Sequence, residues 1–300
     1  MGLSMFRTAL ISMFLTSTAL ADTWTVDDDG KADFDNIQDA IDAASNGDEI
    51  LVMPGTYTGT GDEVVDMLGK AVWLHSSDGS EVTIIDGEGV RRVFFCYSGE
   101  TNMTIIEGMT ILGGLASGDY PNSTGGGMRN QNNSNPTMTN CIFTNNNAGY
   151  GGGMYNNNSS PMLTNCTFTD NTGEFGGGMR NASGSNPMLT NCTFTGNTAD
   201  YGGGMYSSIS NPTLINTLVC GNTLDQINGD YTDGGGNTIA DVCPIDCPSD
   251  INGDGYVNVS DLLTIIDQWG LTNSQADVNQ DGIVDVSDLL IVISNWGPCE

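Results

Sequence analysis

The sequence predicts an all-β solenoid, in which short parallel strands stack coil upon coil, followed by a small α-helical module. Two observations support this. Gly-Gly-Gly-Met occurs at residues 125–128, 151–154, 176–179 and 202–205, so one unit repeats at steps of 26, 25 and 26 residues. A repeat of this period, built from short runs of β-branched and aromatic residues between Gly, Asn and Pro, is typical of a β-solenoid. Near the C-terminus a different motif occurs twice, 27 residues apart, and each copy runs into an apolar helical segment.

Composition restricts the function before any element is placed. The 300 residues hold 37 acids against seven Lys and Arg, for a net charge of −30. Phosphate recognition needs clustered Lys and Arg, so composition excludes a nucleic-acid partner and disfavours an anionic membrane surface. The 41 glycines and 38% hydrophobic residues are unlike an ordinary helical enzyme, and the charged fraction of 15% argues against general disorder.

Residues 1–21 predict a secretory signal peptide. Arg7 precedes the apolar run Ala9–Leu15, and Ala19-Leu20-Ala21 forms a small-x-small cleavage site. The apolar run is too short to span a bilayer, and no other run is long enough. The expected mature chain is secreted, extracellular or associated with a cell surface, where disulfides can form. A retained N-terminal anchor is the alternative.

Residues 33–44 predict a capping helix ahead of the coils. Phe34, Ile37, Ile41 and Ala44 share one helical face. A solenoid needs its open end covered, because exposed strand edges recruit other chains. The strands expected after this helix are less regular than the later repeats: Ile50–Val52, Val72–Leu74, Val82–Ile85, Val93–Phe95, Met103–Ile106 and Met109–Leu112.

The regular coils, residues 125–222, repeat the pattern Pro-x-x-Thr-Asn-Cys-x-Phe-Thr, with a degenerate last copy. Alternation along a strand places Leu163, Cys166 and Phe168 inside, with a kink at Asn165 because Asn tolerates left-handed backbone. Stacking then predicts columns of like residues: Cys141, Cys166 and Cys192; Phe143, Phe168 and Phe194; Met128, Met154, Met179 and Met205; Asn140, Asn165, Asn191 and Asn216. We interpret the cysteines as buried filler, with metal binding or disulfide exchange as the alternative.

Thr25–Gly30, Phe34, Ile37–Ile41 and Ile50–Tyr57 form a distinctive opening. It resembles the opening of the pectin lyase-like superfamily, which pectinesterases share, and the repeated units resemble coils of secreted bacterial β-helix proteins. The resemblance implies a right-handed parallel β-helix over residues 22–240. This superfamily includes lyases, hydrolases, esterases and proteins without catalysis, so the fold alone does not decide the activity.

Residues 249–300 predict a calcium module, reached through a linker at 241–248. Each of two twelve-residue loops places oxygen ligands at positions 1, 3, 5, 9 and 12, a backbone carbonyl at position 7 and Gly at position 6 for a sharp turn. Asp/Asn-rich turns without metal are the alternative. The expected ligands of two Ca²⁺ ions are Asp250, Asn252, Asp254, Tyr256, Asn258 and Asp261, then Asp277, Asn279, Asp281, Ile283, Asp285 and Asp288.

The paired loops and helices resemble a type I dockerin, with Asp in place of Glu at position 12 and no full helix before the first loop. The resemblance implies that calcium orders the module and that positions 10 and 11 bind a cohesin-like partner. These positions hold Val259, Ser260, Val286 and Ser287. Valine at position 10 departs from the polar residue that better-known dockerins often carry, so the identity of the partner stays open.

The cysteines outside the repeats suggest two disulfides. Cys247 and Cys299 flank the C-terminal module and would clasp its ends. Cys220 and Cys243 are a possible second pair, which would leave Cys96 single. Sequence does not fix connectivity, so both pairings are guesses from position.

Catalytic candidates are few. The regular coils carry almost no acids, so they cannot supply the paired carboxylates of a glycoside hydrolase. They likewise lack the calcium-binding acids that a pectate lyase needs together with an Arg base. The weak candidates lie upstream: Asp86, Glu88, Arg91, Arg92 and Glu107. A solvated salt-bridge group is the alternative interpretation.

The residue after each Gly-Gly-Gly-Met is expected to face outward if Met faces inward. This column alternates guanidinium and phenol, a favourable cation–π arrangement: Arg129, Tyr155, Arg180 and Tyr206. A second aromatic column precedes the glycines: Tyr150, Phe175 and Tyr201. Aromatic rows with few charges suit sugar rings, so we predict glycan binding at the first column. Mutual stacking that only stabilises the solenoid is the alternative.

Two functions follow from these features. The first is a secreted, non-catalytic β-helix that contacts a glycan or cell surface and is attached to a cohesin-type partner by a calcium-dependent dockerin. The second is a polysaccharide-degrading enzyme, either a polysaccharide lyase or an O-glycosyl hydrolase, carried by the same dockerin. Convergent carboxylates and Arg in an open groove would favour the enzyme, and a flat, salt-bridged surface would favour the non-catalytic protein.

Overall fold

The computed structural model describes residues 21–243, 247–252, 256–272 and 274–299. These residues form two compact units, divided between Ile239 and Ala240. The predicted signal peptide lies outside the described residues, apart from Ala21. In the described segments, no helix has the length and apolar character needed to cross a membrane.

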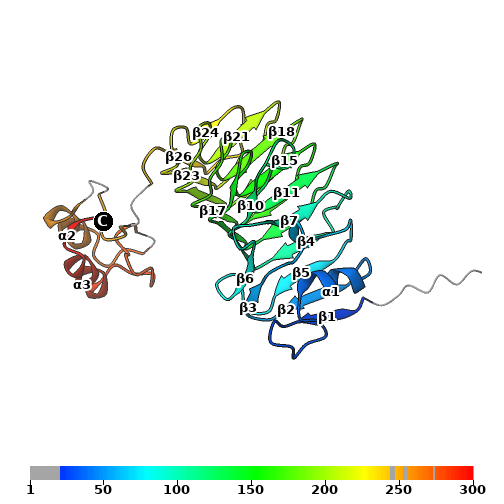
Figure 1. Ribbon diagram of the computed structural model, residues 1–300. Helices are drawn as coiled ribbons and strands as arrows, with labels where there is room; N and C mark the ends of the chain where they lie inside the picture. Colours follow the sequence, from blue (N-terminus) through cyan, green and yellow to red (C-terminus); the bar gives the residue numbers. More distant parts are fainter. Residues whose placement is uncertain (1–20, 244–246, 253–255, 273, 300) are drawn as a thin grey trace, which may run out of the picture. The chain divides into compact units, whose positions relative to one another are not determined.

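The first unit is a coil of parallel strands that contribute in turn to three sheets (Figure 1). The first sheet contains β1 (Thr23–Val26), β2 (Glu49–Val52), β5 (Trp73–Ser76), β8 (Ile105–Glu107), β12 (Thr137–Thr139), β16 (Met162–Thr164), β19 (Met188–Thr190), β22 (Thr213–Ile215) and β25 (Thr232–Asp233). The second contains β3 (Gly55–Tyr57), β6 (Thr83–Asp86), β9 (Thr110–Leu112), β13 (Ile142–Thr144), β17 (Thr167–Thr169), β20 (Thr193–Thr195), β23 (Leu218–Cys220) and β26 (Thr238–Ala240).

The third sheet and a small side ribbon complete the coil. The third sheet contains β4 (Glu63–Asp66), β7 (Arg92–Cys96), β11 (Met128–Gln131), β15 (Met154–Asn157), β18 (Met179–Ala182), β21 (Met205–Ser208) and β24 (Ile227–Asn228). The short strands β10 (Leu115–Ala116) and β14 (Asn147–Ala148) pair in parallel beside it. Every registered pair in this unit is parallel, so the predicted parallel β-helix is confirmed.

Columns of like residues fill the interior, as the repeat predicts. The four methionines of the Gly-Gly-Gly-Met motif are in register and fully buried: Met128, Met154, Met179 and Met205. The rings of Phe143, Phe168 and Phe194 stack with centroids 4.5 Å apart and planes within 5°. The regular coils therefore bury these side chains against identical ones in the neighbouring regular coils.

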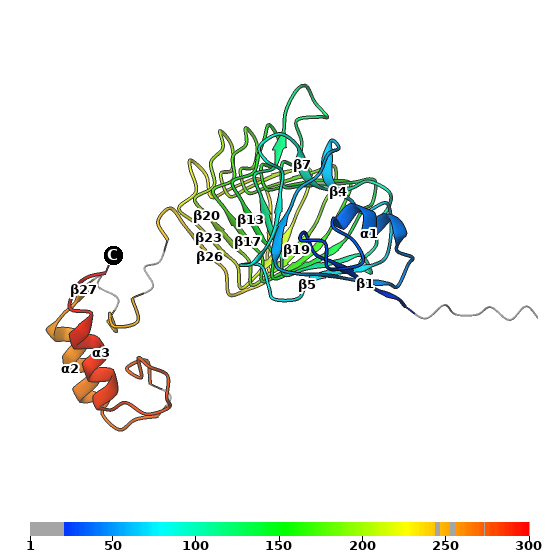
Figure 2. The ribbon, with the colours of Figure 1, turned by 60° about the horizontal axis from the view of Figure 1, so that its bottom comes forward.

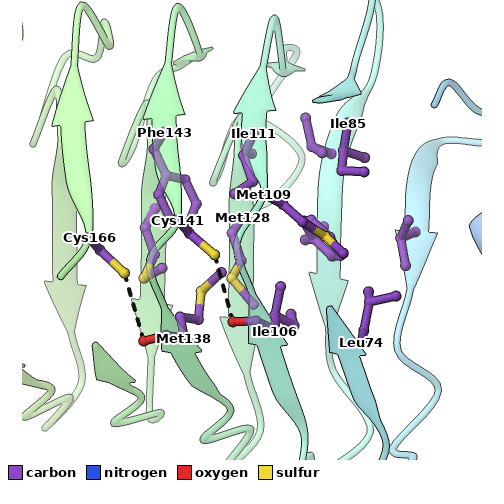
Figure 3. Close-up of a cluster of buried hydrophobic side chains, with 14 of the residues drawn as sticks. Leu74, Ile85, Ile106, Met109, Ile111, Met128, Met138, Cys141, Phe143 and Cys166 are labelled. Carbon is purple, nitrogen blue, oxygen red and sulfur yellow. Dashed lines mark hydrogen bonds between the residues drawn. The ribbon is translucent and has the colours of Figure 1, made fainter. Parts of the chain in front are cut away.

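The cysteine column lies in the same interior. Cys141, Cys166 and Cys192 are free and buried. Figure 3 shows the Sγ atoms of the first two pointing inward, where Cys141 donates to the Ile106 carbonyl at 3.6 Å and Cys166 to the Met138 carbonyl at 3.7 Å. This apolar, weakly hydrogen-bonded environment suits the predicted role as small buried filler.

The chain turns sharply at the predicted asparagines between the first and second sheets. Asn140, Asn165, Asn191 and Asn216 have φ values of 55°, 54°, 53° and 48°, in the left-handed region. Asn165 Nδ2 donates to Asn140 Oδ1 at 3.0 Å, and Asn191 Nδ2 donates to Asn165 Oδ1 at 3.2 Å. The predicted amide column is therefore confirmed over three coils.

A second asparagine ladder is buried, and the sequence patterns above do not indicate it. It runs through Asn146, Asn171, Asn197 and Asn222. Asn171 Nδ2 donates to the Phe143 carbonyl and to Asn197 Oδ1, both at 2.9 Å. A third, shorter ladder joins Asn130, Asn156 and Asn181. These amides bond successive coils where water does not reach.

The triple glycines let neighbouring coils approach closely. A Cβ on Gly152 would lie 2.3 Å from the Thr172 carbonyl oxygen and 2.7 Å from that of Gly177. Gly151, the first glycine of that unit, has φ +67°. The repeated motif thus reflects steric need at the coil–coil contact.

Helix α1 (Ile37–Ala43) forms inside the segment predicted as a cap. Asn36 is its N-cap, and Asn36 Oδ1 accepts from the Asp39 backbone N–H at 2.9 Å. Ile37 and Ile41 are buried in the same core as the coils, and the helix contacts β1, β2 and β4 (Figure 2). Its function as an end cap stays a prediction.

The second unit contains two helices, α2 (Val259–Asp267) and α3 (Val286–Ser294), and an antiparallel pair, β27 (Tyr256–Val257) and β28 (Gly297–Pro298). Each helix begins with a reciprocal capping box, formed by Asp261 or Asp288 at its third position. The small core is made by Val257, Ile265, Ala276, Val284 and Val292.

The disulfides agree with the expectations in part. Cys247 is bonded to Cys299, as predicted, so the ends of the second unit are joined. Cys96 is free and buried, also as predicted. Cys220 and Cys243 are disulfide-bonded, and their pairing with each other stays a prediction.

Candidate functional site

The second loop, Asp277–Asp288, gathers oxygen atoms around its turn. The carboxylate of Asp277 accepts the backbone N–H groups of Asp281 at 3.1 Å and Gly282 at 2.9 Å. Asn279 Nδ2 lies 3.0 Å from Asp281 Oδ2. Gly282 has φ +100°, so the sharp turn falls at position 6 of the loop, as predicted. The side chains at positions 1, 3 and 5 therefore crowd into one small volume.

Position 12 has the same environment in both loops. Asp261 and Asp288 are fully buried. In each, Oδ1 accepts the N–H of position 3, at 3.2 Å in the first loop and 3.0 Å in the second, and Oδ2 accepts the N–H of position 9, at 2.9 Å in both. Burial by itself raises the pKa of Asp288, but the backbone N–H groups outweigh it and lower the pKa overall.

This donor set fits a hard divalent cation. Ionised carboxylates, amide oxygens and carbonyls are the ligands that Ca²⁺ prefers. Asp254, a predicted ligand of the first loop, lies outside the described residues. Among the residues that the structure describes, the loops included, no three Asp, Glu, His or Cys side chains form a group that could hold a metal ion. Both loops mix acids with amides and carbonyls.

Helices α2 and α3 each expose an apolar face. Together with the tryptophan that follows each helix, its members are 49–59% exposed and repeat at the same spacing: Val259, Leu263, Ile266 and Trp269, then Val286, Leu290, Ile293 and Trp296. Ser260 and Ser287, the other predicted partner-binding residues, are exposed beside them. Positions 10 and 11 were predicted from the sequence and the other six members were not, although two apolar rows outside the core positions are visible in it.

The five catalytic candidates are not one cluster. Asp86 ends β6 in the second sheet, Arg92 begins β7 in the third, and Glu107 ends β8 in the first. Arg91 forms an ion pair with Glu88. Asp86, Arg92 and Glu107 therefore lie on three different sheets, and a catalytic role for the five candidates stays a prediction.

Arg92 is a buried anchor rather than a free cation. Its guanidinium donates to the carbonyls of Asn122, Thr124 and Gly125 at 2.9–3.3 Å. Burial, and then repulsion from Arg129, lowers the pKa of Arg92 to about 10. Arg92 thus ties the 122–125 segment to β7.

An open groove runs beside the third sheet. It is lined by the acids Asp62 and Glu63, the bases Arg91, Arg92 and Arg129, and also Phe95 and Asn122. Burial raises the pKa of Glu63, while Arg92, 3.9 Å away, opposes that rise. The groove collects three of the seven basic residues of a strongly acidic chain. Asp62 and Glu63 were not predicted from the sequence, since neither belongs to a motif with recognisable spacing.

The predicted outer column exists, but it is largely covered. Arg129, Tyr155, Arg180 and Tyr206 are in register on the third sheet. The Arg180 guanidinium lies 6.0 Å from the Tyr155 ring centroid and 5.2 Å from that of Tyr206. Tyr155 is only 2% exposed, and its hydroxyl meets that of Tyr120 at 3.4 Å. Tyr155 therefore offers almost no surface to a sugar.

The second aromatic column packs against itself and against Arg180. Tyr150, Phe175 and Tyr201 stack with centroids 5.4 and 5.1 Å apart and planes within 7°. The guanidinium of Arg180 lies 4.4 Å from the Tyr150 centroid and 5.2 Å from that of Phe175. Neighbouring rings occupy the faces that a sugar would need, so these contacts match the mutual-stacking alternative.

The coils of three parallel sheets define a β-solenoid protein. The two loops with calcium-ligand residues, each followed by a helix, define a second, small module. Residues 69–242 match the family model described as "Right handed beta helix region", and the chain belongs to this family. Residues 248–296 match the model of the dockerin type I domain. The predicted right-handed parallel β-helix with a C-terminal type I dockerin module is thereby confirmed.

Two solved structures are similar to the chain at low identity. Pectate lyase Pel9A is 16% identical with a TM-score of 0.44, over 67% of this chain and 53% of that one, so the chain spans about half its length. Pectin methylesterase from carrot is 14% identical with a TM-score of 0.43, over 76% of this chain and 90% of that one. No curated protein matches the sequence.

Proposed function

We propose that the chain is a secreted, non-catalytic β-helix that contacts a glycan and is attached to a cohesin-type partner by its calcium-loaded dockerin. The observation that carries the attachment is the repeated apolar face on α2 and α3, roughly half exposed at eight equivalent positions. Rows of this kind mark interaction surfaces. Two bound calcium ions would fix the loop ahead of each helix and so hold both faces in one orientation.

The attachment is tested by binding to an immobilised type I cohesin, with calcium and then with EDTA. We expect binding only with calcium. The double variant Val259→Asp/Val286→Asp should lose it, because a charge then sits on both faces, and each single variant should keep part of it if either face suffices. Thr272→Ala, exposed and outside both faces, is the matched control. Binding that survives EDTA would contradict the proposal.

The glycan surface that we assign is the groove beside the third sheet. Asn122 is exposed and offers an amide donor to hydroxyl or carboxylate groups, while Arg129, 8% exposed, and Phe95, whose ring stacks on Tyr97 at 5.4 Å, present only part of their surface. Of the predicted glycan residues, this keeps Arg129 in contact with ligand and leaves Tyr155, Arg180 and Tyr206 as support. Retention on polysaccharide affinity gels should fall at least tenfold in Arg129→Met and little in Tyr206→Ala.

A polysaccharide-degrading enzyme is the second candidate, and the groove is the observation that favours it. Glu63, with a pKa raised by burial, lies near Arg92 and could act as a general acid or base. A polysaccharide panel with added calcium, scored for new reducing or unsaturated ends, decides between the two. Products that vanish in Glu63→Gln but persist in Glu88→Gln would establish the enzyme, and binding without products supports the non-catalytic function.

A further inference from the structure

A hollow over the first sheet has chemistry that neither the groove nor the dockerin uses. It lies at β5 and β8 and is lined by Trp73, His75, Asp78, Glu81, Glu107 and Asn140. The groove described above borders the third sheet instead. The two surfaces therefore belong to different sheets of the coil.

The hollow interrupts the residue pattern of the sheet. Trp73 is in register with Ile105 and then Thr137, and His75 is in register with Glu107 and then Thr139. The regular coils continue these two rows with threonines, methionines and one isoleucine. An exposed tryptophan, the single histidine and a glutamate thus occur together at two coils only.

A series of contacts through Glu49 and His75 holds the Trp73 side chain in place. Glu49 accepts from Thr23 Oγ1 at 2.6 Å and contacts His75 Nε2 at 2.8 Å. An ionised carboxylate only accepts, so His75 donates from Nε2. The imidazole then stacks on the Trp73 indole with centroids 3.9 Å apart and planes within 15°. One face of the indole is therefore covered and held rigidly.

The rest of the indole faces solvent and is edged by polar groups. Trp73 remains 41% exposed although His75 stacks on one face of its indole, so part of the side chain stays open to solvent. Trp73 Nε1 donates to Glu107 Oε2 at 3.1 Å, and Asn140 Nδ2 lies 3.5 Å from Glu107 Oε1. Glu107 keeps lone pairs on both oxygens for further donors.

We propose that this hollow binds a neutral pyranose sugar. The apolar face of the sugar ring stacks on the free face of Trp73, a large flat surface that is already immobilised. Glu107 and Asp78 accept hydroxyl hydrogens, and Asn140 supplies a donor and an acceptor. Four carboxylates line or support the site, so an acidic sugar is repelled. The inference rests on the proposed glycan contact and adds a second site to it.

The test is calorimetric titration of the full chain with cellohexaose, a neutral oligosaccharide, and with hexagalacturonate, an acidic one. Trp73→Ala should weaken cellohexaose binding at least tenfold, and Trp73→Phe, which keeps a flat ring, should weaken it less. Met162→Ala is the matched control, because Met162 is on the same outer sheet surface and is 40% exposed. It should change nothing. Thermal unfolding of each variant confirms that the coils are intact.

Unchanged cellohexaose affinity in Trp73→Ala would overturn the site. So would a wild-type chain that binds hexagalacturonate as tightly as cellohexaose and loses both in Trp73→Ala. Arg129→Met separates this proposal from the groove. If Arg129→Met alone abolishes sugar binding, the hollow is wrong and the glycan-contacting function survives. If no saccharide binds the wild-type chain at all, both proposals fail together.

Discussion

The amide of Asn171 illustrates what one residue contributes to the stacked coils. Its Nδ2 makes two hydrogen bonds, to the Phe143 carbonyl and to Asn197, and its Oδ1 accepts two from Asn146. A side-chain amide has two donors and two lone pairs, so this buried group is fully satisfied. Networks of this kind are strong when complete and costly when broken, because the interior offers no water as a substitute.

Asn171→Ala should lower the free energy of unfolding of the solenoid by at least about 3 kcal/mol, since it leaves several buried partners unsatisfied at about 1–3 kcal/mol each. Urea unfolding followed by circular dichroism measures the change. Asn147→Ala, in an exposed position of the preceding coil beside Thr172, is the control and should stay within about 0.5 kcal/mol of wild type. Equal free energies of unfolding in the two variants would mean that the asparagine ladder does not stabilise the solenoid.

Asp48 predicts a pH dependence at the first coils. Hydrogen bonds from the backbone N–H groups of Ser45 and Asp22 hold its pKa below the ordinary 3.8. A lowered folded pKa means that the stabilisation is complete above the unfolded value and is lost as pH falls through the folded one. Asp48→Asn should therefore cost about 1–3 kcal/mol of unfolding free energy at pH 7 and clearly less near pH 3.

Unfolding of wild type and Asp48→Asn at both pH values provides the measurement. Asp35→Asn, an exposed acid just before α1, is the control and should behave like wild type. A deficit in Asp48→Asn that grows on acidification would have the wrong sign and would refute the assignment.

At the level of elements, the repeats made most of the solenoid predictable. Cys166 and Phe168 alternate correctly because one face of each strand is buried, which fixes its register. The early strands were placed from short apolar runs, and β2 and β5–β9 are found there. The repeat period also predicts the columns of like residues, because equivalent positions stack whatever rotamers their side chains adopt.

Other features need coordinates. Asn146 and Asn140 are the same residue type within one unit, yet the first is buried and the second is exposed at a corner. Strand β4, which carries Glu63, reads Glu-Val-Val-Asp and is too short to stand out by periodicity. The groove itself arises from segments about 30 residues apart, so no local pattern indicates it.

The glycine contacts predict a steric effect on the coil stack. In Gly152→Ala the new methyl would meet backbone oxygen of the next coil at 2.3 Å, so coils must separate, and the midpoint of thermal unfolding should fall by several degrees. Gly61→Ala is the matched control, with its nearest neighbour at 3.5 Å. Scanning calorimetry of the two variants against wild type gives the answer, and equal midpoints would contradict it.

For the whole molecule, the chain divides into two units with separate cores. The solenoid is held by neighbour-to-neighbour contacts along its length, whereas the second unit has a core of five fully buried apolar residues. A core that small rarely suffices alone, so metal and a disulfide are expected to supply the rest. The two units should therefore respond differently to chelation and reduction.

Calcium removal should destabilise the second unit and leave the solenoid unchanged. Without calcium, the negative charge of the buried Asp261 and Asp288 and of the other loop carboxylates is no longer neutralised, so the loops lose stability. Calorimetry with calcium and with EDTA should show one transition that moves by many degrees and one that stays. A solenoid transition that shifts equally would show that the units do not fold independently.

Loss of the Cys247–Cys299 bond should act on the same unit. The double variant Cys247→Ser/Cys299→Ser should lower its unfolding free energy by about 2–4 kcal/mol, because the bond closes a long loop in the unfolded chain. Cohesin binding at saturating calcium reports the effect as weakened affinity. Cys96→Ser, in the solenoid, is the control for removal of a sulfur and should leave cohesin affinity unchanged.

The Gly-Gly-Gly-Met rungs touch only the rungs on either side of them. A deletion or duplication of one whole unit, such as residues 151–175, would leave every surviving rung with a neighbour of the same kind. The gene segment that encodes these near-identical units is thus free to recombine with itself. Loss or gain of whole units would change the length of the solenoid in steps of about 4.8 Å and would keep the same core packing between coils.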